Sequence, residues 1–298
     1  MNRLILLLPL MFLVACQGKA SSGKVDEAGK KLLQHEFVAS AADSSFFDEV
    51  MKEVLEPMDT VVPFNQRITA AAKAFLGTPY LAATLEKEGE EQLIVNLRNV
   101  DCTTFVEYVL AMSHVSQESG ADFGRMAYEL QRLRYRNGVV DGYPSRLHYF
   151  TDWLKNNERS GYLTLISDSI GNASMDMELD FMSTHPGFYP ILDKNPALVE
   201  KIRLVEEDMS GYDLAFITKD RIEERENQIA DGDIIAFVTT IDGLDVSHTG
   251  FAHFQNGRLH LLHASTRSNL VEISPVPLSQ YLQNRTTVSG ILVARPLF

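Results

Sequence analysis

The dipeptide Asn256-Gly257 constrains the fold of this chain more than any other short stretch. Asn and Gly tolerate the positive φ angles of a type I′ turn, so the pair predicts a two-residue loop between two antiparallel strands. The flanking segments 249–255 and 258–264 alternate in the way that paired strands require. Because such a turn fixes the register, His253 is expected to lie directly opposite His260.

This register also sorts the remaining histidines of the hairpin. Alternation places His248 and His263 on one mostly apolar face as diagonal neighbours, close enough for their imidazoles to form a hydrogen bond. His253 and His260 fall on the opposite face, where we expect a solvated cross-strand pair. The structural alternative for His248 and His263 is a pair of buried core histidines whose polar atoms are satisfied.

The hairpin belongs to a β-rich region that begins near residue 231. Helical periodicity occupies most of the chain before it, and an Asn195-Pro196 start signal predicts one more helix. Because the helices precede most of the strands, the sequence predicts an α+β fold in which N-terminal helices pack on a small antiparallel β-sheet. The expected helices are 43–55, 66–76 (capped by Asn65), 122–136 and 145–157, and the expected strands are 162–170, 233–239, 249–255, 258–264, 269–274 and 289–294.

Cys102 follows a strand-like run at 93–97 and opens a further helix with an apolar stripe. Asp101 is a suitable N-cap, which places Cys102 in the first turn of that helix. The unpaired N–H groups and the dipole of a helix N-terminus favour a thiolate over a thiol. Cys102 is therefore a candidate nucleophile, and the alternative is a small buried apolar residue.

A thiol hydrolase needs a histidine base that a third polar group orients. We expect His248 to be the general base and His263 to hold its tautomer. The chain has no His-Glu-x-x-His, Cys-x-x-Cys or Gly-x-Ser-x-Gly motif, so zinc peptidase and serine hydrolase chemistry lack support. No cofactor or metal is expected, although a three-histidine metal site that includes His185 remains an alternative.

The N-terminus has the pattern of an export signal. An apolar run at 4–14 follows Arg3, and Leu13-Val14-Ala15-Cys16 resembles the lipobox of bacterial lipoproteins. This resemblance implies cleavage before Cys16 and lipidation of its thiol, and the alternative is an ordinary secretory signal. We expect a lipoprotein signal at 1–16, a tether at 17–40, and one domain at 41–298 with an insertion at about 138–230. The protein would be exported, anchored to a bacterial membrane and facing the periplasm.

Several motifs together resemble the NlpC-type branch of papain-like cysteine hydrolases, which cut cell-wall peptides. The matching pieces are Gly77-Thr78-Pro79-Tyr80, Asp101-Cys102, Asp231-Gly232-Asp233, Ser247-His248 and His263, and they cover roughly 65–115 and 230–298. The resemblance implies a papain-like fold with Cys102 as nucleophile, His248 as base and His263 as third member. It also implies that Tyr80 and the backbone N–H of Cys102 stabilise the oxyanion.

The long segment between Cys102 and His248 departs from the compact members of that branch. Segments 146–150 and 183–187 resemble a smaller group of N-acetylmuramoyl-L-alanine amidases, so the implied substrates are peptidoglycan fragments (muropeptides) and the implied bond is the lactyl–L-alanine amide. The expected substrate-binding residues are Arg146, His148, Thr184, His185 and Ser247. A γ-D-glutamyl-diamino acid endopeptidase and a catalytically silent glycan- or peptide-binding lipoprotein are the alternatives.

Composition limits the partners. The formal net charge of −13 argues against nucleic acid, because binding to phosphates needs basic clusters that this chain does not show. Hydrophobic residues make up 45% and charged residues 22% of the 298 positions, which is typical of a globular protein. We expect a monomer.

Overall fold

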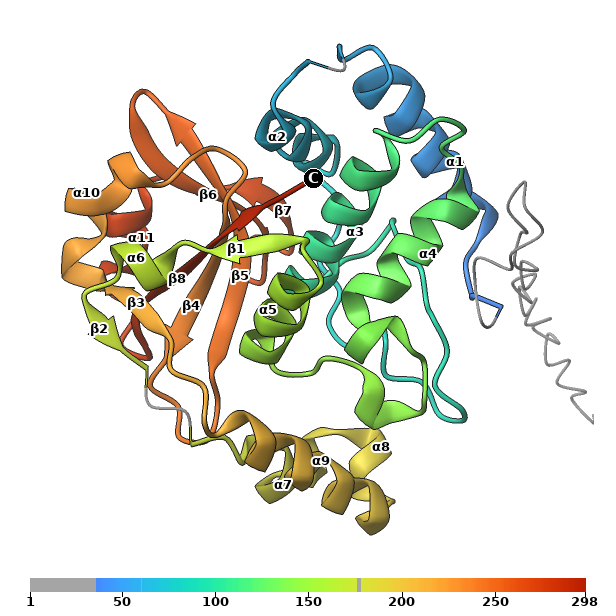
Figure 1. Cartoon of the computed structure of the whole chain (residues 1–298), viewed down its shortest axis with the longest axis vertical. Coiled ribbons are helices and arrows are strands. Elements are labelled where there is room, and N and C mark those ends of the chain that lie inside the picture. Colours follow the sequence, from blue (N-terminus) through green and yellow to red (C-terminus); the bar gives the residue numbers. More distant parts are fainter. Residues whose placement is uncertain (1–35, 60, 176–177) are drawn as a thin grey trace, which may run out of the picture.

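A computed structural model describes residues 36–59, 61–175 and 178–298, which form one mixed α+β body around an antiparallel sheet (Figure 1). The eight strands run in the order β2-β3-β8-β4-β5-β6-β7, and β1 also pairs with β8. The strands are β1 Leu163–Leu165, β2 Ala173–Ser174, β3 Ala215–Thr218, β4 Ile234–Thr239, β5 Val246–Gln255, β6 Arg258–Ser265, β7 Leu270–Ile273 and β8 Val288–Pro296.

Helices cover both sides of this sheet. The α-helices are α1 Ala41–Val50, α2 Phe64–Ala74, α3 Cys102–Val115, α4 Phe123–Arg134, α5 Phe150–Arg159, α6 Ser167–Ile170, α7 Phe181–Thr184, α8 Pro190–Asp193, α9 Pro196–Met209, α10 Ile222–Arg225 and α11 Leu278–Gln283. A π-helical turn, Met51–Leu55, extends α1, and short 3₁₀ turns occupy Arg136–Gly138, Tyr143–Ser145, Pro186–Phe188, Lys219–Arg221 and Glu226–Gln228.

The β5–β6 hairpin has the predicted turn and register. Asn256 and Gly257 have φ angles of 51° and 77°, and His253 lies opposite His260. The strands expected from residue 231 onward all form, within a few residues of their predicted ends. The predicted α+β class is therefore confirmed.

The region expected as an insertion is partly built into the sheet. Strands β1 and β3, which lie within 138–230, both pair with β8. Only the segment that carries α7, α8 and α9 extends away from the sheet, at the bottom of Figure 1. The expected small sheet is therefore larger than predicted, because short strands such as Ala215–Thr218 carry too little pattern to be recognised.

Four local predictions are wrong. The run at 93–97 forms an isolated bridge, Val38 with Ile94, rather than a strand. Helix α2 begins at Phe64, so its N-cap is Pro63 and not Asn65. The helix predicted from 145 begins only at Phe150, and the strand predicted at 162–170 ends at Leu165, where α6 follows. These ends depend on contacts between distant segments rather than on local pattern.

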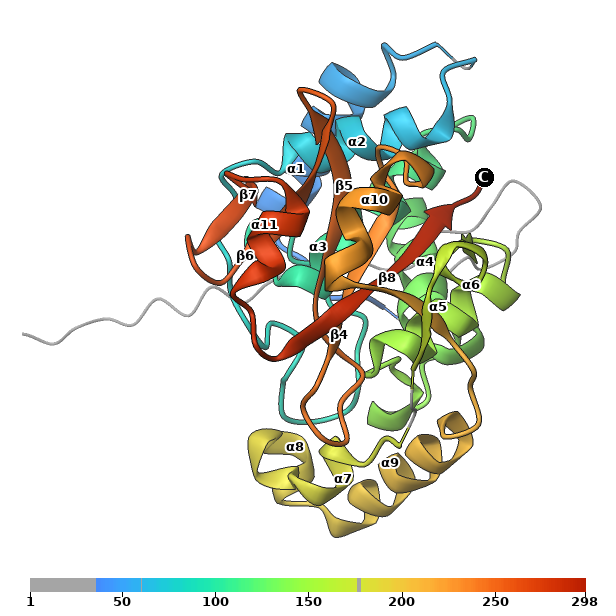
Figure 2. The same cartoon turned by 90° about the vertical axis from the view of Figure 1, so that its left-hand side faces the viewer.

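The sheet has two apolar faces with different helices on them (Figures 1 and 2). On one, here called the α11 face, Phe237 and Leu261 share a core with Leu278 of α11. On the other, the α3 face, the ring of Phe251 lies 5.6 Å from that of Phe105 in α3. Helix α3 therefore packs against the strands of the β5–β6 hairpin.

The predicted N-terminal features lie mostly outside the described residues. The signal at 1–16, with Cys16, and the tether up to residue 35 are not part of the described structure. The last residues of the expected tether are ordered, because Phe37 is buried and Ser40 caps α1 through a reciprocal bond with Asp43. Within 36–59, 61–175 and 178–298, no helix has the length and apolar character to cross a bilayer.

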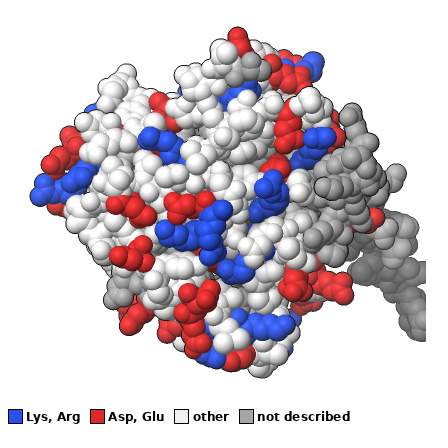
Figure 3. All heavy atoms as spheres, in the orientation of Figure 1, with Lys and Arg blue, Asp and Glu red and all other residues white. Residues whose placement is uncertain are grey.

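Charged side chains of both signs are interspersed over the face seen in Figure 3. Exposed ion pairs join residues that are near in sequence, such as Arg203 with Glu200 in α9 and Arg221 with Glu224 at the start of α10. Exposed pairs of this kind contribute little stability individually. That face shows no continuous basic surface.

Candidate active site

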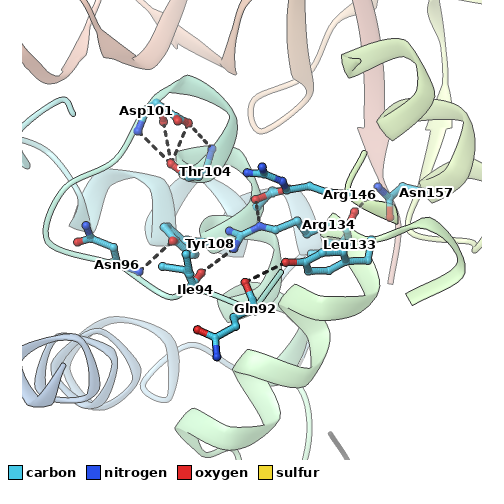
Figure 4. Close-up of polar contacts among 12 residues, drawn as sticks. Gln92, Ile94, Asn96, Asp101, Thr104, Tyr108, Leu133, Arg134, Arg146 and Asn157 are labelled. Carbon is cyan, nitrogen blue, oxygen red and sulfur yellow. Dashed lines mark hydrogen bonds and ion pairs between the residues drawn. The ribbon is translucent and has the colours of Figure 1, made fainter. Parts of the chain in front are cut away.

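Cys102 is the first residue of α3, as predicted. The Oδ1 atom of Asp101 accepts the backbone N–H of Thr104 at 2.8 Å, and the Thr104 hydroxyl accepts the N–H of Asp101 at 2.9 Å (Figure 4). This reciprocal pair is a capping box, which fixes the helix start. The thiol therefore occupies a defined position at the N-terminus of a long helix.

A buried polar network holds the rest of α3 in place (Figure 4). Arg134 of α4 donates to Glu107 of α3 at 2.7 Å and to the carbonyl of Ile94 at 2.6 Å, and both charged side chains are buried. The hydroxyl of Tyr108 accepts the N–H of Asn96 at 2.9 Å. Removing one member of such a buried ion pair typically costs about 3–5 kcal/mol, so the helix that carries Cys102 is rigidly placed.

The sulfur of Cys102 is hydrogen-bonded to the backbone of Thr249, the residue that follows His248 on β5. Burial raises the pKa of the Cys102 thiol to about 12, and the Asp101 carboxylate acts in the same direction. The Thr249 bond and bonds to Thr103 oppose this rise in pKa. Burial of the sulfur therefore acts against the expected preference for a resting thiolate at the helix start.

His248 and His263 form the predicted contact. The Nε2 atom of His248 lies 2.7 Å from Nδ1 of His263, and the two rings meet nearly at right angles. Both rings lie on the α11 face, since His248 packs against Phe237 and His263 against Tyr281. Helix α3 packs on the opposite face, against Phe251, and Cys102 meets β5 at its backbone.

The environment of the two imidazoles keeps them neutral. Burial lowers the pKa of His248 well below its ordinary value, and the neighbouring His263 and Arg285 act in the same direction. Burial also lowers the pKa of His263 to about 4, against a smaller opposing effect of Glu272. A neutral His248 whose Nε2 is bonded to His263 has one ring nitrogen left, Nδ1, that can accept a proton.

Tyr80 lies beside this site on a segment tied to the sheet edge. Its backbone N–H donates to the carbonyl of Asn269 at 2.8 Å, and Gly77 donates to Val271 of β7 at 2.9 Å. Burial raises the pKa of Tyr80 to about 12, and the neighbouring Cys102 and Asp101 add to this effect. The phenol therefore stays protonated and can donate a hydrogen bond.

The expectation of a solvated pair at His253 and His260 is wrong. Both are buried, with exposed fractions of 8% and 7%. The Nδ1 atom of His253 lies 2.8 Å from the carboxylate of Asp231, and that of His260 lies 2.7 Å from the carbonyl of Ser274. The register was right, but the α3 face, where these rings point, is also covered by protein.

Arg146 is not free to bind a substrate. Its guanidinium lies 2.7 Å from Glu86 and 3.3 Å from Glu91, and it lies over the ring of Tyr143 at 4.9 Å. Only 5% of the residue is exposed. The geometry supports a structural role instead: Arg146 fixes the segment that follows Tyr80, because that segment carries both glutamates.

The other predicted substrate-binding residues divide into two groups. His148 is committed to structure, since its Nε2 atom lies 2.8 Å from the carbonyl of Tyr143 and its ring packs on that tyrosine. Thr184 and His185 are exposed, and their side chains bond to each other at 3.0 Å. Ser247 is also exposed, directly before His248. Only the exposed three can meet a ligand from solution.

Two contributors to the site were missed by sequence reasoning. Thr249 acts through its backbone, which leaves no side-chain signal. Glu272 lies directly opposite His263 in the β6–β7 ladder, with its Oε1 3.9 Å from Nε2. Alternation alone would have placed Glu272 beside His263 if the register of the second hairpin had been known. In the described part of the chain, no three His, Cys, Asp or Glu side chains are grouped as a metal site.

The fold and this site define an α+β protein with a thiol at a helix start and a histidine pair on the adjoining strands. Residues 70–291 match the family model described as AmiA-like, N-acetylmuramoyl-L-alanine amidase-like. The chain therefore belongs to that family. A search of curated protein sequences finds no match.

Solved structures agree with the family. A crystal structure of an N-acetylmuramoyl-L-alanine amidase from Bacteroides uniformis ATCC 8492 is 37% identical, with a TM-score of 0.76, covering 79% of this chain and 99% of that one. A Bacteroides fragilis protein provisionally named a xylanase is 42% identical, with a TM-score of 0.73, over 76% and 99% of the two chains. A Legionella pneumophila protein, LPG0564, shares the fold at 21% identity, with a TM-score of 0.63, over 87% and 94%.

Proposed function

We propose that this chain is a cysteine N-acetylmuramoyl-L-alanine amidase that hydrolyses the amide between the muramyl lactyl group and L-Ala in muropeptides. Family membership supports an amidase that acts on material derived from peptidoglycan. One observation supports the cysteine mechanism. The Cys102 sulfur is hydrogen-bonded to the backbone of Thr249, and the preceding residue, His248, is bonded through its Nε2 to His263.

In the proposed acylation, the Cys102 sulfur attacks the carbonyl carbon of the lactyl group while Nδ1 of His248 takes the thiol proton. Because the resting pair is a neutral thiol and a neutral imidazole, proton transfer accompanies the attack rather than preceding it. The C–N bond then breaks, and His248 returns the proton to the departing amine of L-Ala. The sugar remains on the enzyme as a thioester.

The oxyanion formed in each step needs donors that are already in place. The backbone N–H of Cys102, at the first position of α3, and the protonated phenol of Tyr80 are the proposed donors. In deacylation, water attacks the thioester with His248 as base, and the thiol recovers its proton. No group other than water is consumed.

The finer relationship to the NlpC-type, papain-like hydrolases remains part of this proposal. It is supported by the motifs around Tyr80, Cys102, His248 and His263, which occur in the order expected for that branch. We retain Thr184, His185 and Ser247 as candidate substrate contacts because they are exposed.

The cellular location is also a proposal, which rests on the lipobox-like Leu13-Val14-Ala15-Cys16. The expected consequence is cleavage before Cys16 and lipidation of its thiol, which anchors the enzyme to a membrane, facing the periplasm. Replacing Cys16 by Ser should leave the precursor unlipidated and shift it from the detergent phase to the aqueous phase. Identical partitioning of the two proteins would contradict lipidation.

The decisive experiment is digestion of a muramyl-tripeptide followed by mass spectrometry. The proposed amidase releases an intact tripeptide and a free muramyl sugar, and Cys102→Ala is the matched inactive control. Release of the free diamino acid, with L-Ala-γ-D-Glu left on the muramyl sugar, would establish the endopeptidase alternative instead. No cleavage by the wild-type protein would favour a catalytically silent binding protein.

The xylanase name of the Bacteroides fragilis relative points to a different chemistry. Glycoside hydrolysis normally uses two carboxyl groups on either side of the scissile bond. Here the groups at the site are a thiol and two imidazoles, and the two nearby carboxylates have other partners: Asp101 caps α3 and Glu272 lies beside His263. Incubation with xylan should therefore release no reducing sugar.

A further inference from the structure

We infer that Glu272 is a positioning residue of this site, which sets the tautomer of His263 and through it the proton acceptor of His248. The inference rests on the proposed function, because the expected tautomer follows from His248 acting as the base, and its structural readout needs no substrate. It concerns a carboxylate on the strand next to the histidine pair.

The proposed role of His248 fixes where each ring of the pair carries its proton. For His248 to accept a proton at Nδ1, its own ring proton must be on Nε2. That Nε2–H then donates to Nδ1 of His263 across 2.7 Å, which requires Nδ1 of His263 to be unprotonated. A neutral His263 must then carry its proton on Nε2.

The Nε2 atom of His263 lies in a buried environment. His263 is 1% exposed, and within the described residues its Nε2 atom has no hydrogen-bond partner. A buried N–H without a partner costs about 1–3 kcal/mol, which would favour the wrong tautomer. Something must therefore stabilise the proton on Nε2.

Glu272 is the group placed to do so. It pairs with His263 in the β6–β7 ladder, and its Oε1 lies 3.9 Å from Nε2, about 1 Å beyond the usual N–H···O distance. Its side chain is 26% exposed, so it has room to rotate toward the ring. Hydrogen bonds of this kind are often long in unliganded sites and shorten when the substrate binds.

The other groups packed around His263 cannot replace Glu272. The Tyr281 ring of α11 lies 5.6 Å away, and its hydroxyl accepts from Arg285 at 2.7 Å. Arg285 is a cation and opposes a positive His263. Among the neighbours named for this ring, Glu272 is the carboxylate that can accept from Nε2–H.

The test compares Glu272→Ala, which removes the acceptor, with Glu272→Gln, which keeps an acceptor oxygen at the same length. Glu224→Ala, at an exposed glutamate on α10, is the matched surface control. The readouts are kcat and KM on a muropeptide, and the ¹⁵N chemical shifts of the His263 ring, which report its tautomer directly.

We expect wild-type His263 to show a protonated Nε2 and a bare Nδ1. Glu272→Ala should lose this preference and lower kcat about tenfold to a hundredfold with little change in KM, the usual size of an effect on a residue that orients another. Glu272→Gln should restore most of both, and Glu224→Ala should change neither.

The inference is overturned if wild-type His263 carries its proton on Nδ1, if Glu272→Ala leaves the tautomer and kcat unchanged, or if Glu272→Gln is as impaired as Glu272→Ala. The ring shifts need no substrate. A protein that shows the expected tautomer change but cleaves no muropeptide would therefore contradict the proposed function and leave this inference standing.

Discussion

The Nε2 atom of His248 lies 2.7 Å from Nδ1 of His263, which joins two adjacent strands through one imidazole pair. In the proposed mechanism the two rings have unequal roles, because Nδ1 of His248 takes the thiol proton while His263 holds Nε2 of His248. Cys102→Ala and His248→Ala should therefore each abolish turnover, while His263→Ala should lose about tenfold to a hundredfold in kcat. Steady-state kinetics on a muropeptide measures all three.

The buried histidines of the opposite face serve as controls for that series. His260→Ala should retain kcat but unfold at lower denaturant concentration, since it removes a buried ring bonded to the Ser274 carbonyl. If His260→Ala abolished activity in a folded protein, the assignment of the two faces would be wrong.

The raised pKa of Cys102 predicts a thiol that reacts slowly with iodoacetamide at neutral pH. Because only the thiolate is alkylated and the pKa lies at about 12, the rate should keep rising with pH beyond 9. The measurement needs a Cys16→Ser background, with Cys102→Ser as the unlabelled control. A rate that is already constant at pH 7 would instead reveal a stable thiolate–imidazolium pair.

Arg146→Ala is expected to destabilise the protein rather than to act on substrate affinity alone. The change leaves Glu86 and Glu91 without their buried cation, a loss of about 3–5 kcal/mol for this type of ion pair. Urea denaturation should show it. The double variant Arg146→Met, Glu91→Gln should recover part of the lost free energy of unfolding, because fewer charges remain uncompensated. Full stability of Arg146→Ala would restore its candidacy as a substrate ligand.

Gly250→Ala tests how tightly His263 is placed. A Cβ at Gly250 would lie 2.8 Å from the Cβ of His263 and 2.7 Å from the carbonyl of Leu262, so the histidine strand must shift. We expect kcat to fall about a hundredfold, the typical effect of a 1 Å displacement at a catalytic group. Gly211→Ala, where the added atom meets nothing within 4 Å, should be unaffected in the same assay.

Stability should fall as the solution is acidified below pH 6.5. Burial lowers the pKa of His114 to about 4, so between pH 6.5 and 4 the unfolded chain binds a proton that the folded chain excludes. His114 packs against Phe64 and Tyr162, so His114→Phe should fit the site. Urea unfolding gives the free energy of unfolding of the variant minus that of wild type. This difference should be about 1–2 kcal/mol more favourable to the variant at pH 5 than at pH 8. The same difference in free energy of unfolding at both pH values would contradict the lowered pKa of His114.

Some features of this protein follow from its sequence because their causes are local. The Asn256-Gly257 turn and the alternation on both sides of it set the hairpin register, and with it the contact between His248 and His263. Asp101 sets the start of α3 in the same way, since a capping side chain acts on backbone within one turn. These patterns act over a few residues, and the structure agrees with them.

Other features were decided only by tertiary structure. The pKa of Cys102 depends on how much protein covers the sulfur, and no sequence pattern gives that burial. Arg146 meets Glu86 across 60 positions of sequence, and β3 joins the sheet through β8, far along the chain. Burial and ion pairing arise from segments that only folding brings together. Local propensity therefore predicted which residues could do chemistry, while packing determined which of them are free to do it.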